Sequence, residues 1–315
     1  MLNLSKRHRG MLEMATAMVL SGTLGYFVLE TGQPAHQVVF YRCLLGAVFI
    51  GLVGVIFRLF PFSALTWKSF MLCGLCGFAI VANWVLLFSA YRFSTISIAT
   101  AVYHTQPFFL LLIGAVVYRK ALSLGKTLWI FLAFIGVVLT VDLTGDHFSL
   151  SSSHTIGLVF ALGAALLYAA VTMISKRLKK IGPYFVAFLQ LSVGTMVLWP
   201  FMDHGQFDNI TALQWRYLIL IGAVHTCFKY MLMYSAWQKL KTPMIAVMAF
   251  IYPAIAILVD YLAYGQVLSL TQSIGIGLIV IAGYAVSMNH RFPFTPKKKI
   301  RLRKKKKNPQ KVKTF

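Results

Sequence analysis

AYRFSTISIATAVYHTQPFFLLLIGAVVYRKALSL, residues 90–124, and AWQKLKTPMIAVMAFIYPAIAILVDYLAYGQVLSL, residues 236–270, are two versions of one pattern. An offset of 146 residues aligns Ala90 with Ala236, Pro107 with Pro253, Tyr118 with Tyr264, Ser123 with Ser269 and Leu124 with Leu270. Each version is an apolar stretch that has a proline near its middle and ends in a short turn. Self-similarity at a fixed offset indicates an internal repeat. We therefore expect two related halves.

The composition is that of a membrane protein. Of the 315 residues, 59% are apolar and only 12% are charged, and the mean hydropathy is +0.76, far from the values of soluble domains. A spanning helix needs about 20 mostly apolar residues. We expect an all-α integral membrane fold with ten transmembrane helices, at residues 11–29, 37–57, 69–90, 95–118, 124–141, 155–174, 183–202, 214–236, 243–264 and 270–288.

The basic residues predict how these helices are oriented. If the N-terminus is cytoplasmic, 26 of the 30 Lys and Arg residues fall in cytoplasmic segments and two, Arg92 and Arg216, fall outside. The remaining two, Arg42 and Lys229, lie within helices. Cytoplasmic loops carry the excess of Lys and Arg in membrane proteins. We therefore expect both termini in the cytoplasm and a multi-pass protein of the cell's inner (plasma) membrane.

The repeat divides the expected helices into two sets of five. The first half is expected at residues 1–150, the second at 151–290, and a disordered basic tail at 291–315. Because five is an odd number, the halves must cross the membrane in opposite orientations. Such inverted repeats place a binding site at their interface, and rocking of one half against the other exposes it to each side in turn. This symmetry favours a transporter, since neither a channel nor a membrane-embedded enzyme needs it.

Several motifs resemble those of EamA-type transporters of the drug/metabolite transporter (DMT) superfamily. They are Tyr41-Arg42-Cys43-Leu44-Leu45, Tyr264-Gly265-Gln266-Val267-Leu268-Ser269 and the glycine-rich stretch at residues 274–283. The resemblance covers nearly the whole chain except the basic tail. It implies ten helices and the export or exchange of amino acids, other metabolites or drugs. The chain departs from the family after the fourth and ninth helices, where Arg119-Lys120 and Gly265-Gln266 replace the usual Gly-Glu.

Lys229 is the clearest candidate for a substrate contact. It lies 13 residues after Arg216 and 10 before Lys239, which puts it near the middle of the membrane at about 1.5 Å of rise per residue. A charge at that depth costs roughly 3 kcal/mol on insertion scales. The lysine either binds a substrate carboxylate or forms a switching ion pair in a cavity, or its ammonium reaches the inner headgroups. Its mate in the repeat is Asn83, which we expect to face the same interior.

Two prolines mark a second candidate region. Pro107 and Pro253 are expected at the centres of their helices, where proline frees the carbonyl four residues earlier and kinks the helix. Transporters place ligands and hinges at such breaks, although ordinary interhelical contact is the alternative. His104 is also a candidate proton relay, since imidazole titrates near physiological pH. The expected cavity lining is Trp84, Tyr103, His104, Gln106, Tyr168, Phe250 and Tyr252, with core contact as the alternative role for Trp84 and Tyr168.

Three charged groups are expected near the outer side of the membrane. Glu30 and Arg42 most simply form a structural ion pair across the turn at residues 31–36. Asp260 replaces Gly114 of the first half, so the repeated fold does not require its charge. It either attracts a cationic or amino group at an outer gate or extends to the membrane interface.

The basic tail is expected to bind anionic phospholipid, because each basic residue near such a surface contributes about 1 kcal/mol. Nucleic-acid binding is not expected, since the tail has no interleaved aromatic residues and the chain has no folded reader. The four cysteines lie in apolar stretches, and we expect no cofactor and no metal site. The lipid-binding residues are expected to be Lys297, Lys298, Lys299, Arg301, Arg303, Lys304, Lys305, Lys306 and Lys307.

These observations predict a secondary-active exporter or exchanger, present as a monomer or homodimer. Its substrate is a small polar metabolite, with an amino acid or amine favoured because Lys229 and Asp260 carry opposite charges. A multidrug or lipophilic-cation exporter is the alternative. An enzyme is not expected, because no clustered nucleophile or acidic pair is present. No phosphate-binding loop occurs either, so protons or a counter-solute would supply the energy.

Overall fold

The computed structural model describes residues 6–119, 122–140, 153–175, 177–178, 181–202, 210–240, 244–245, 248–288 and 290. Regular structure in these ranges is helical, without a strand. Seven helical segments are long and apolar enough to cross a membrane, and three further apolar helices are shorter. The expected all-α membrane fold is confirmed at this level.

The seven long segments include two that combine more than one helix. The single helices are α1 (Lys6–Glu30), α2 (Ala35–Ile56), α3 (Trp67–Phe93) and α7 (Ser153–Ser175). α8 (Pro183–Leu198) continues into the 3-10 turn η2 (Trp199–Phe201), and another short turn, η1 (Phe62–Ala64), precedes α3. The combined segments are α4 (Ile96–Tyr103) with α5 (Gln106–Val117), and α9 (Ala212–Gly222), η4 (Ala223–Phe228) and α10 (Lys229–Lys239). The shorter helices are α6 (Leu124–Thr140), α12 (Ile251–Tyr264) and α13 (Leu270–Ser287).

The two prolines break their helices instead of bending them. α4 ends at Tyr103, and Pro107 lies in the first turn of the separate helix α5. Pro253 likewise lies in the first turn of α12, directly after a turn at residues 249–250. The expectation of mid-helix kinks was therefore wrong in form. A helix's first turn tolerates proline because the missing N–H would have no intrahelical partner there.

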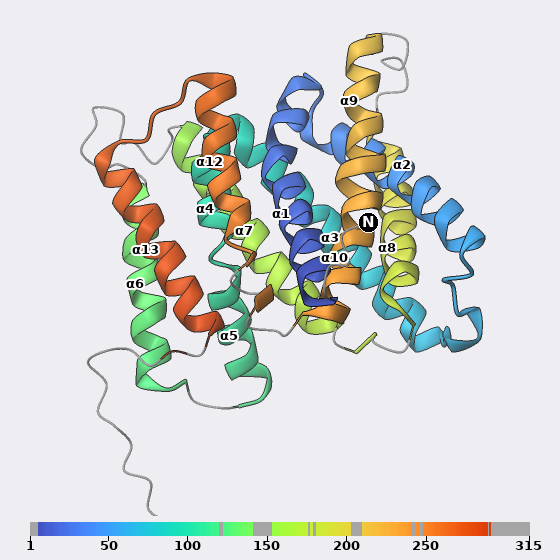
Figure 1. Ribbon diagram of the computed structural model, residues 1–315, viewed down its shortest axis with the longest axis horizontal. Coiled ribbons are helices and arrows are strands. Elements are labelled where there is room, and N and C mark those ends of the chain that lie inside the picture. The colour runs from blue at the N-terminus through green and yellow to red at the C-terminus, as the bar shows by residue number, and fades with distance from the viewer. Residues whose placement is uncertain are drawn as a thin grey trace, which may run out of the picture.

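The helices form one bundle with two recognisable edges (Figure 1). α6 and α13 lie side by side at one edge, where the backbone of Gly136 closely approaches that of Gly275. α2, α8 and α9 form the opposite edge, and α1 lies between the edges in contact with α10 and α12. α3 packs along α7. Residues from both halves of the chain therefore contact one another through the middle of the bundle.

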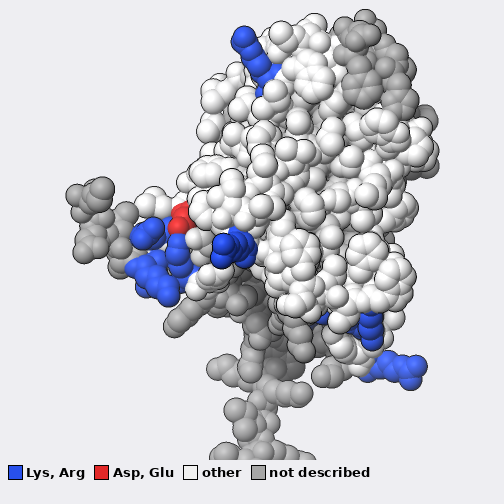
Figure 2. Space-filling model, turned by 90° about the vertical axis from the view of Figure 1, so that its right-hand side faces the viewer, with Lys and Arg blue, Asp and Glu red and all other residues white. Residues whose placement is uncertain are grey.

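The surface is mainly apolar, as a bilayer requires. Large apolar side chains are widely exposed, among them Val55 and Leu262 at 70% each. Figure 2 shows a face on which Lys and Arg gather at the lower end, with one basic group at the upper edge and a broad uncharged band between. A soluble monomer rarely exposes so much contiguous apolar surface.

Candidate functional site

Arg42 is buried in the bundle and does not form the expected ion pair with Glu30. Its side chain, 2% exposed, donates a hydrogen bond from Nε to Thr226 Oγ1 at 3.1 Å, and its guanidinium lies 4.0 Å from the centre of the Trp84 ring. Glu30 instead accepts a hydrogen bond from the Tyr264 hydroxyl at 3.0 Å. The ion-pair prediction was wrong because Arg42 lies on the face of α2 that points to the interior. There its side chain contacts the Thr226 hydroxyl and the Trp84 ring.

Lys229 is also buried, with 8% of its surface exposed. Its Nζ lies 5.1 Å from the centre of the Tyr230 ring, and Tyr230 also interacts electrostatically with Arg42. Tyr230 therefore borders both cations. Within the described ranges Lys229 has no carboxylate partner, since the ion pair there is formed by Lys239 with Glu13.

Asp260 has a structural partner at the start of α4. Its carboxylate, 2% exposed, accepts a hydrogen bond from the backbone N–H of Ser97 at 2.8 Å. A carboxylate at a helix N-terminus satisfies an otherwise unpaired donor and interacts favourably with the helix dipole. Ser97 precedes the break at His104 by seven residues, which places it about 10 Å away along the helix. Asp260 therefore has a partner of its own and forms no ion pair with Lys229.

Asn83 and Tyr103 are brought together, as expected for groups that line one interior. The Asn83 amide, fully buried, donates to the Tyr103 hydroxyl at 3.4 Å and to the backbone carbonyl of Ala164. Its side-chain oxygen is buried without a hydrogen-bond partner in the described structure. The Tyr168 ring packs edge-on against Tyr103 with centroids 5.8 Å apart. The Asn83 oxygen therefore lacks a hydrogen-bond partner in the described structure and lies beside the Tyr103 and Tyr168 rings.

The two helix breaks meet each other at His104. The His104 ring lies 5.0 Å from the Tyr252 ring and 6.2 Å from the Phe250 ring, which stand at the break of the second half. Its Nδ1 lies 2.9 Å from the carbonyl of Thr100, and the imidazole also interacts with the backbone of Ala249. The Ala249 carbonyl, whose usual helical donor position is occupied by Pro253, accepts from the Tyr252 N–H at 3.3 Å. The two breaks are therefore joined by one imidazole.

Two further groups complete the region around the breaks. The Tyr252 hydroxyl lies 3.0 Å from the Tyr91 hydroxyl, which ties α12 to α3. Gln106 is the first residue of α5, directly after the break between α4 and α5. Its Oε1 is buried without a hydrogen-bond partner among the described residues. The sequence-predicted polar and aromatic residues thus gather on both sides of the breaks.

The π-helical segment η4 contains two residues that the sequence analysis missed, His225 and Thr226. Thr226 accepts from Arg42 and donates to the carbonyl of Ile221 at 2.8 Å. His225 Nε2 lies 3.2 Å from Thr23 Oγ1 on α1. The sequence predicts a regular helix here, because the extra residue of a π-turn has no signature in hydrophobic periodicity. Such turns are frequent at functional sites.

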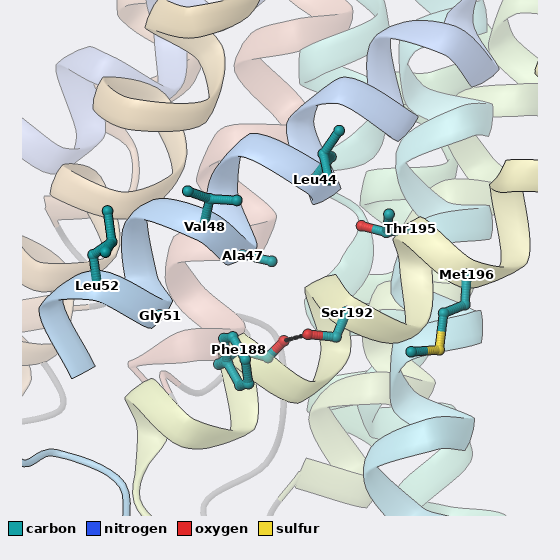
Figure 3. Close-up of a pocket in the computed structure, with 9 residues that line it drawn as sticks. All are labelled: Leu44, Ala47, Val48, Gly51, Leu52, Phe188, Ser192, Thr195 and Met196. Atoms are coloured by element: carbon teal, nitrogen blue, oxygen red, sulfur yellow. Dashed lines mark hydrogen bonds between the residues drawn. The ribbon is translucent and has the colours of Figure 1, made fainter. Parts of the chain in front are cut away.

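One open groove lies away from these residues. It encloses about 430 Å³ between α2 and α8 (Figure 3). The hydroxyls of Ser192 and Thr195 donate to carbonyls of their own helix, so the groove offers little polar recognition. Several lining residues are exposed, including Leu52 at 56% and Met196 at 73%. We interpret it as part of the lipid-facing surface. Its lining is Leu44, Ala47, Val48, Gly51, Leu52, Phe188, Ser192, Thr195 and Met196.

Two other predictions concern the basic tail and metal binding. The expected phospholipid-binding tail lies outside the described residues, so its lysines and arginines keep the status of predictions. Within the described residues, no group of three or more His, Cys, Asp or Glu side chains could hold a metal ion. The cysteines are all free and buried: Cys43, Cys73, Cys76 and Cys227.

Paired helix breaks and buried polar groups inside an apolar bundle are typical of membrane transporters. Comparison with known proteins is more specific: residues 8–142 and 155–288 each match the EamA-like transporter family, and the chain belongs to this family. It is therefore a multi-pass membrane protein, which in bacteria means the inner membrane.

Similar proteins support the same assignment. The chain is 30% identical over 286 residues to the uncharacterized transporter YxxF of Bacillus subtilis (strain 168), covering 91% of each chain. It is 23% identical over 202 residues to the riboflavin transporter ImpX of Fusobacterium nucleatum subsp. nucleatum, covering 62% of this chain and 68% of that protein. One crystal structure, 18% identical, superposes with a TM-score of 0.61 over 89% of this chain and 96% of its own, which supports the fold alone.

Proposed function

We propose that this chain is a secondary-active exporter or exchanger that moves a small polar metabolite by alternating access. The observation that carries the proposal is the meeting of the two helix breaks at His104 and Tyr252, 5.0 Å between ring centres. Broken helices from corresponding positions of two repeats form the binding site and hinge in many transporters. A solute bound beside this contact would lie between the two halves and could be released to either side as they rock.

The proposal includes ten spans in two inverted halves, with both termini in the cytoplasm. Support comes from the order of elements, because α5, which carries Pro107, precedes α6 as α12, which carries Pro253, precedes α13. The family match also falls into two successive segments of similar length. The gathering of basic groups at one end of the molecule agrees with a cytoplasmic side there (Figure 2).

The buried groups favour a polar solute over a lipophilic cation. Asn83 and Gln106 have buried oxygens without hydrogen-bond partners in the described structure, and such groups cost free energy until a ligand pairs with them. A cation would be repelled by Arg42 and Lys229. Asp260, which motivated an amine, is already hydrogen-bonded to Ser97. Amino acids keep their place as candidates through their carboxylate.

A flavin is the second candidate, since the name of one relative specifies riboflavin. The supporting observation is the aromatic group of Trp84, Tyr103, Tyr168 and Tyr252 in the interior. Aromatic side chains stack on planar rings. Riboflavin therefore belongs in any substrate screen of this protein.

The test is a thermal-shift screen of metabolites on the purified full-length chain, followed by flux measurements in proteoliposomes. We expect saturable uptake that is accelerated by the same solute on the opposite side, because a carrier with alternating access returns faster when loaded. Non-saturating flux without this acceleration would indicate a channel. The absence of flux for every solute that binds would refute transport itself.

One matched pair of variants tests the role of the helix breaks. Pro253→Ala restores a backbone N–H that can donate to the Ala249 carbonyl, which should stiffen the break and lower the maximal flux while the protein still binds its solute. Pro200→Ala, in η2 and away from the breaks, is the control and should transport normally. Equal flux in both variants would contradict the hinge.

A further inference from the structure

The interior contains two positive charges without a matching negative charge in the described structure. Arg42 and Lys229 are 2% and 8% exposed, and a charge at membrane depth costs roughly 3 kcal/mol on insertion scales. The chain has seven carboxylates in all. The three that the structure describes are engaged elsewhere: Glu13 with Lys239, Glu30 with Tyr264 and Asp260 with Ser97.

The two cations belong to one site. Thr226 accepts from Arg42 Nε, and Lys229 begins α10 three residues after Thr226, close enough to Arg42 for the two charges to interact. Tyr230 borders both, because it interacts electrostatically with Arg42 and its ring centre lies 5.1 Å from the Lys229 ammonium. His225, on the neighbouring face, contacts Thr23 of α1 and supplies no negative charge.

Close backbone approach fixes the position of Arg42. A Cβ added at Gly46 would lie 2.9 Å from Thr226 Cγ2, and one added at Gly222 would lie 2.5 Å from Leu45 Cβ. α2 and the column of α9 and η4 can therefore approach only because both positions are glycine. With Nε bound to Thr226 and one face on Trp84, the guanidinium has a single orientation. A guanidinium held in this way is suited to two-point recognition of a planar or tetrahedral oxyanion.

The repeated fold does not require either charge. The offset of 148 pairs Arg42 with Gln190, and the offset of 146 pairs Lys229 with Asn83. Both mates are neutral amides. The π-helical segment likewise has no counterpart at the corresponding residues 77–82, which lie in the uninterrupted helix α3. Charges and a helix irregularity that occur together, without a counterpart at the repeat-related positions, indicate a ligand rather than a folding requirement.

We propose that Arg42 and Lys229 together bind the anionic group of the transported solute, which is therefore a small organic anion bearing a carboxylate or phosphate. This inference rests on the proposed transport function and names the substrate class of the same interior site. The ligand's oxygens supply the missing negative charge, Arg42 orients them, and Lys229 adds a second positive charge. Trp84 and Tyr230 form the aromatic walls.

The experiment measures binding to the purified full-length chain by thermal shift, so that it does not depend on transport. Succinate, succinamide and putrescine share a four-carbon skeleton with charges of about −2, 0 and +2 at neutral pH. Glycerol 3-phosphate against glycerol separates phosphate from carboxylate recognition. We expect succinate or glycerol 3-phosphate to stabilise the protein, and succinamide, glycerol and putrescine to have no effect.

Variants of the site sharpen the test. Lys229→Met and Arg42→Gln should each weaken the binding of the anion about 10- to 100-fold, the range for a lost hydrogen bond to a charged group. Lys229→Arg, which keeps the charge, should restore most of the affinity. Lys126→Gln on α6 removes a lysine outside the site and should bind like the unaltered protein. If Arg42→Gln does not fold, the Lys229 pair carries the test.

The outcomes separate this inference from the proposed function. Stabilisation by putrescine or succinamide, unchanged affinity in Lys229→Met, or no binding of either anion would overturn the anion site. A protein that transports neutral or cationic solutes would keep its proposed function and lose the anion site. A protein that binds succinate but moves no solute would keep the anion site and lose the transport function.

Discussion

Replacing Lys229 by methionine should stabilise the unliganded protein while it weakens anion binding. The lysine is 8% exposed and its ammonium has no carboxylate partner in the described structure. Removing a charge from that depth recovers roughly 3 kcal/mol. The lost contact with the Tyr230 ring, at 5.1 Å, takes back about 1 kcal/mol. The net gain is about 2 kcal/mol, and relief of the repulsion from Arg42 adds in the same direction.

The assay is thermal unfolding of the purified protein in the same detergent, with and without succinate. For a chain of this length, about 2 kcal/mol corresponds to a rise of about 3 °C in Tm. Lys229→Met should therefore melt higher than the unaltered protein without ligand, and succinate should raise its Tm less. Lys229→Arg is the matched control and should behave like the unaltered protein.

A lysine with only a structural role would give the opposite result. If Lys229 held the bundle together through contacts that the described residues do not reveal, Lys229→Met would melt lower without ligand. A lower Tm with undiminished response to succinate would refute the reasoning, because it would separate the lysine from the anion and give it a purpose in folding. A higher Tm with a full response to succinate would refute the binding role alone.

Three further substitutions have defined outcomes in the same assays. Asp260→Asn should lower stability by about 1 kcal/mol, because the helix that begins near Ser97 loses a charge at its N-terminus, while anion affinity should not change; a large loss of affinity would restore Asp260 as a binding residue. Gly46→Ala should cost about 1 to 3 kcal/mol, because the new methyl group would lie 2.9 Å from Thr226 Cγ2, and it should also weaken anion binding; normal stability would show that α2 can shift. Trp84→Leu should be about 1 to 2 kcal/mol less stable than Trp84→Phe, because only phenylalanine keeps a ring face under the buried guanidinium; equal melting would argue against the cation–π contact.

The sequence predicted where the two repeated helices are irregular, but as kinks and not as breaks, from a single residue type. Proline has no N–H and fixes its own φ, so Pro107 and Pro253 constrain the backbone wherever they stand. Proline does not determine whether the helix kinks or ends. That depends on which groups elsewhere in the fold pack against the irregular backbone. Here the His104 ring of the first half lies 5.0 Å from the Tyr252 ring of the second, centre to centre. That contact joins residues 148 apart, and no local pattern reveals it.

For the charged residues, the sequence predicted depth along a helix but not the partner of a side chain. Burial of Lys229 could be predicted, because its depth follows from counting residues between flanking basic groups. The partner of Arg42 could not, because proximity across a short turn suggested Glu30, whereas the direction of the side chain depends on the face of α2 that packs inward. The actual partner, Thr226, stands in a π-turn. A π-turn is stabilised by tertiary contacts and leaves hydrophobic periodicity almost unchanged, so both the turn and its residue were missed.

The charge balance of the interior also bears on whether the proposed carrier exchanges solutes or exports them singly. An empty carrier would have to move two uncompensated cations, Arg42 and Lys229, through a low-dielectric region, whereas a carrier loaded with an organic anion moves them with their charge largely neutralised. Electrostatic energy in such surroundings rises steeply as water is excluded. If Arg42 and Lys229 bind an anion as proposed, the loaded protein should change conformation more readily than the empty one. Such a carrier should exchange one anion for another faster than it exports anions singly, so the proposed anion site itself predicts that solute on the opposite side accelerates flux.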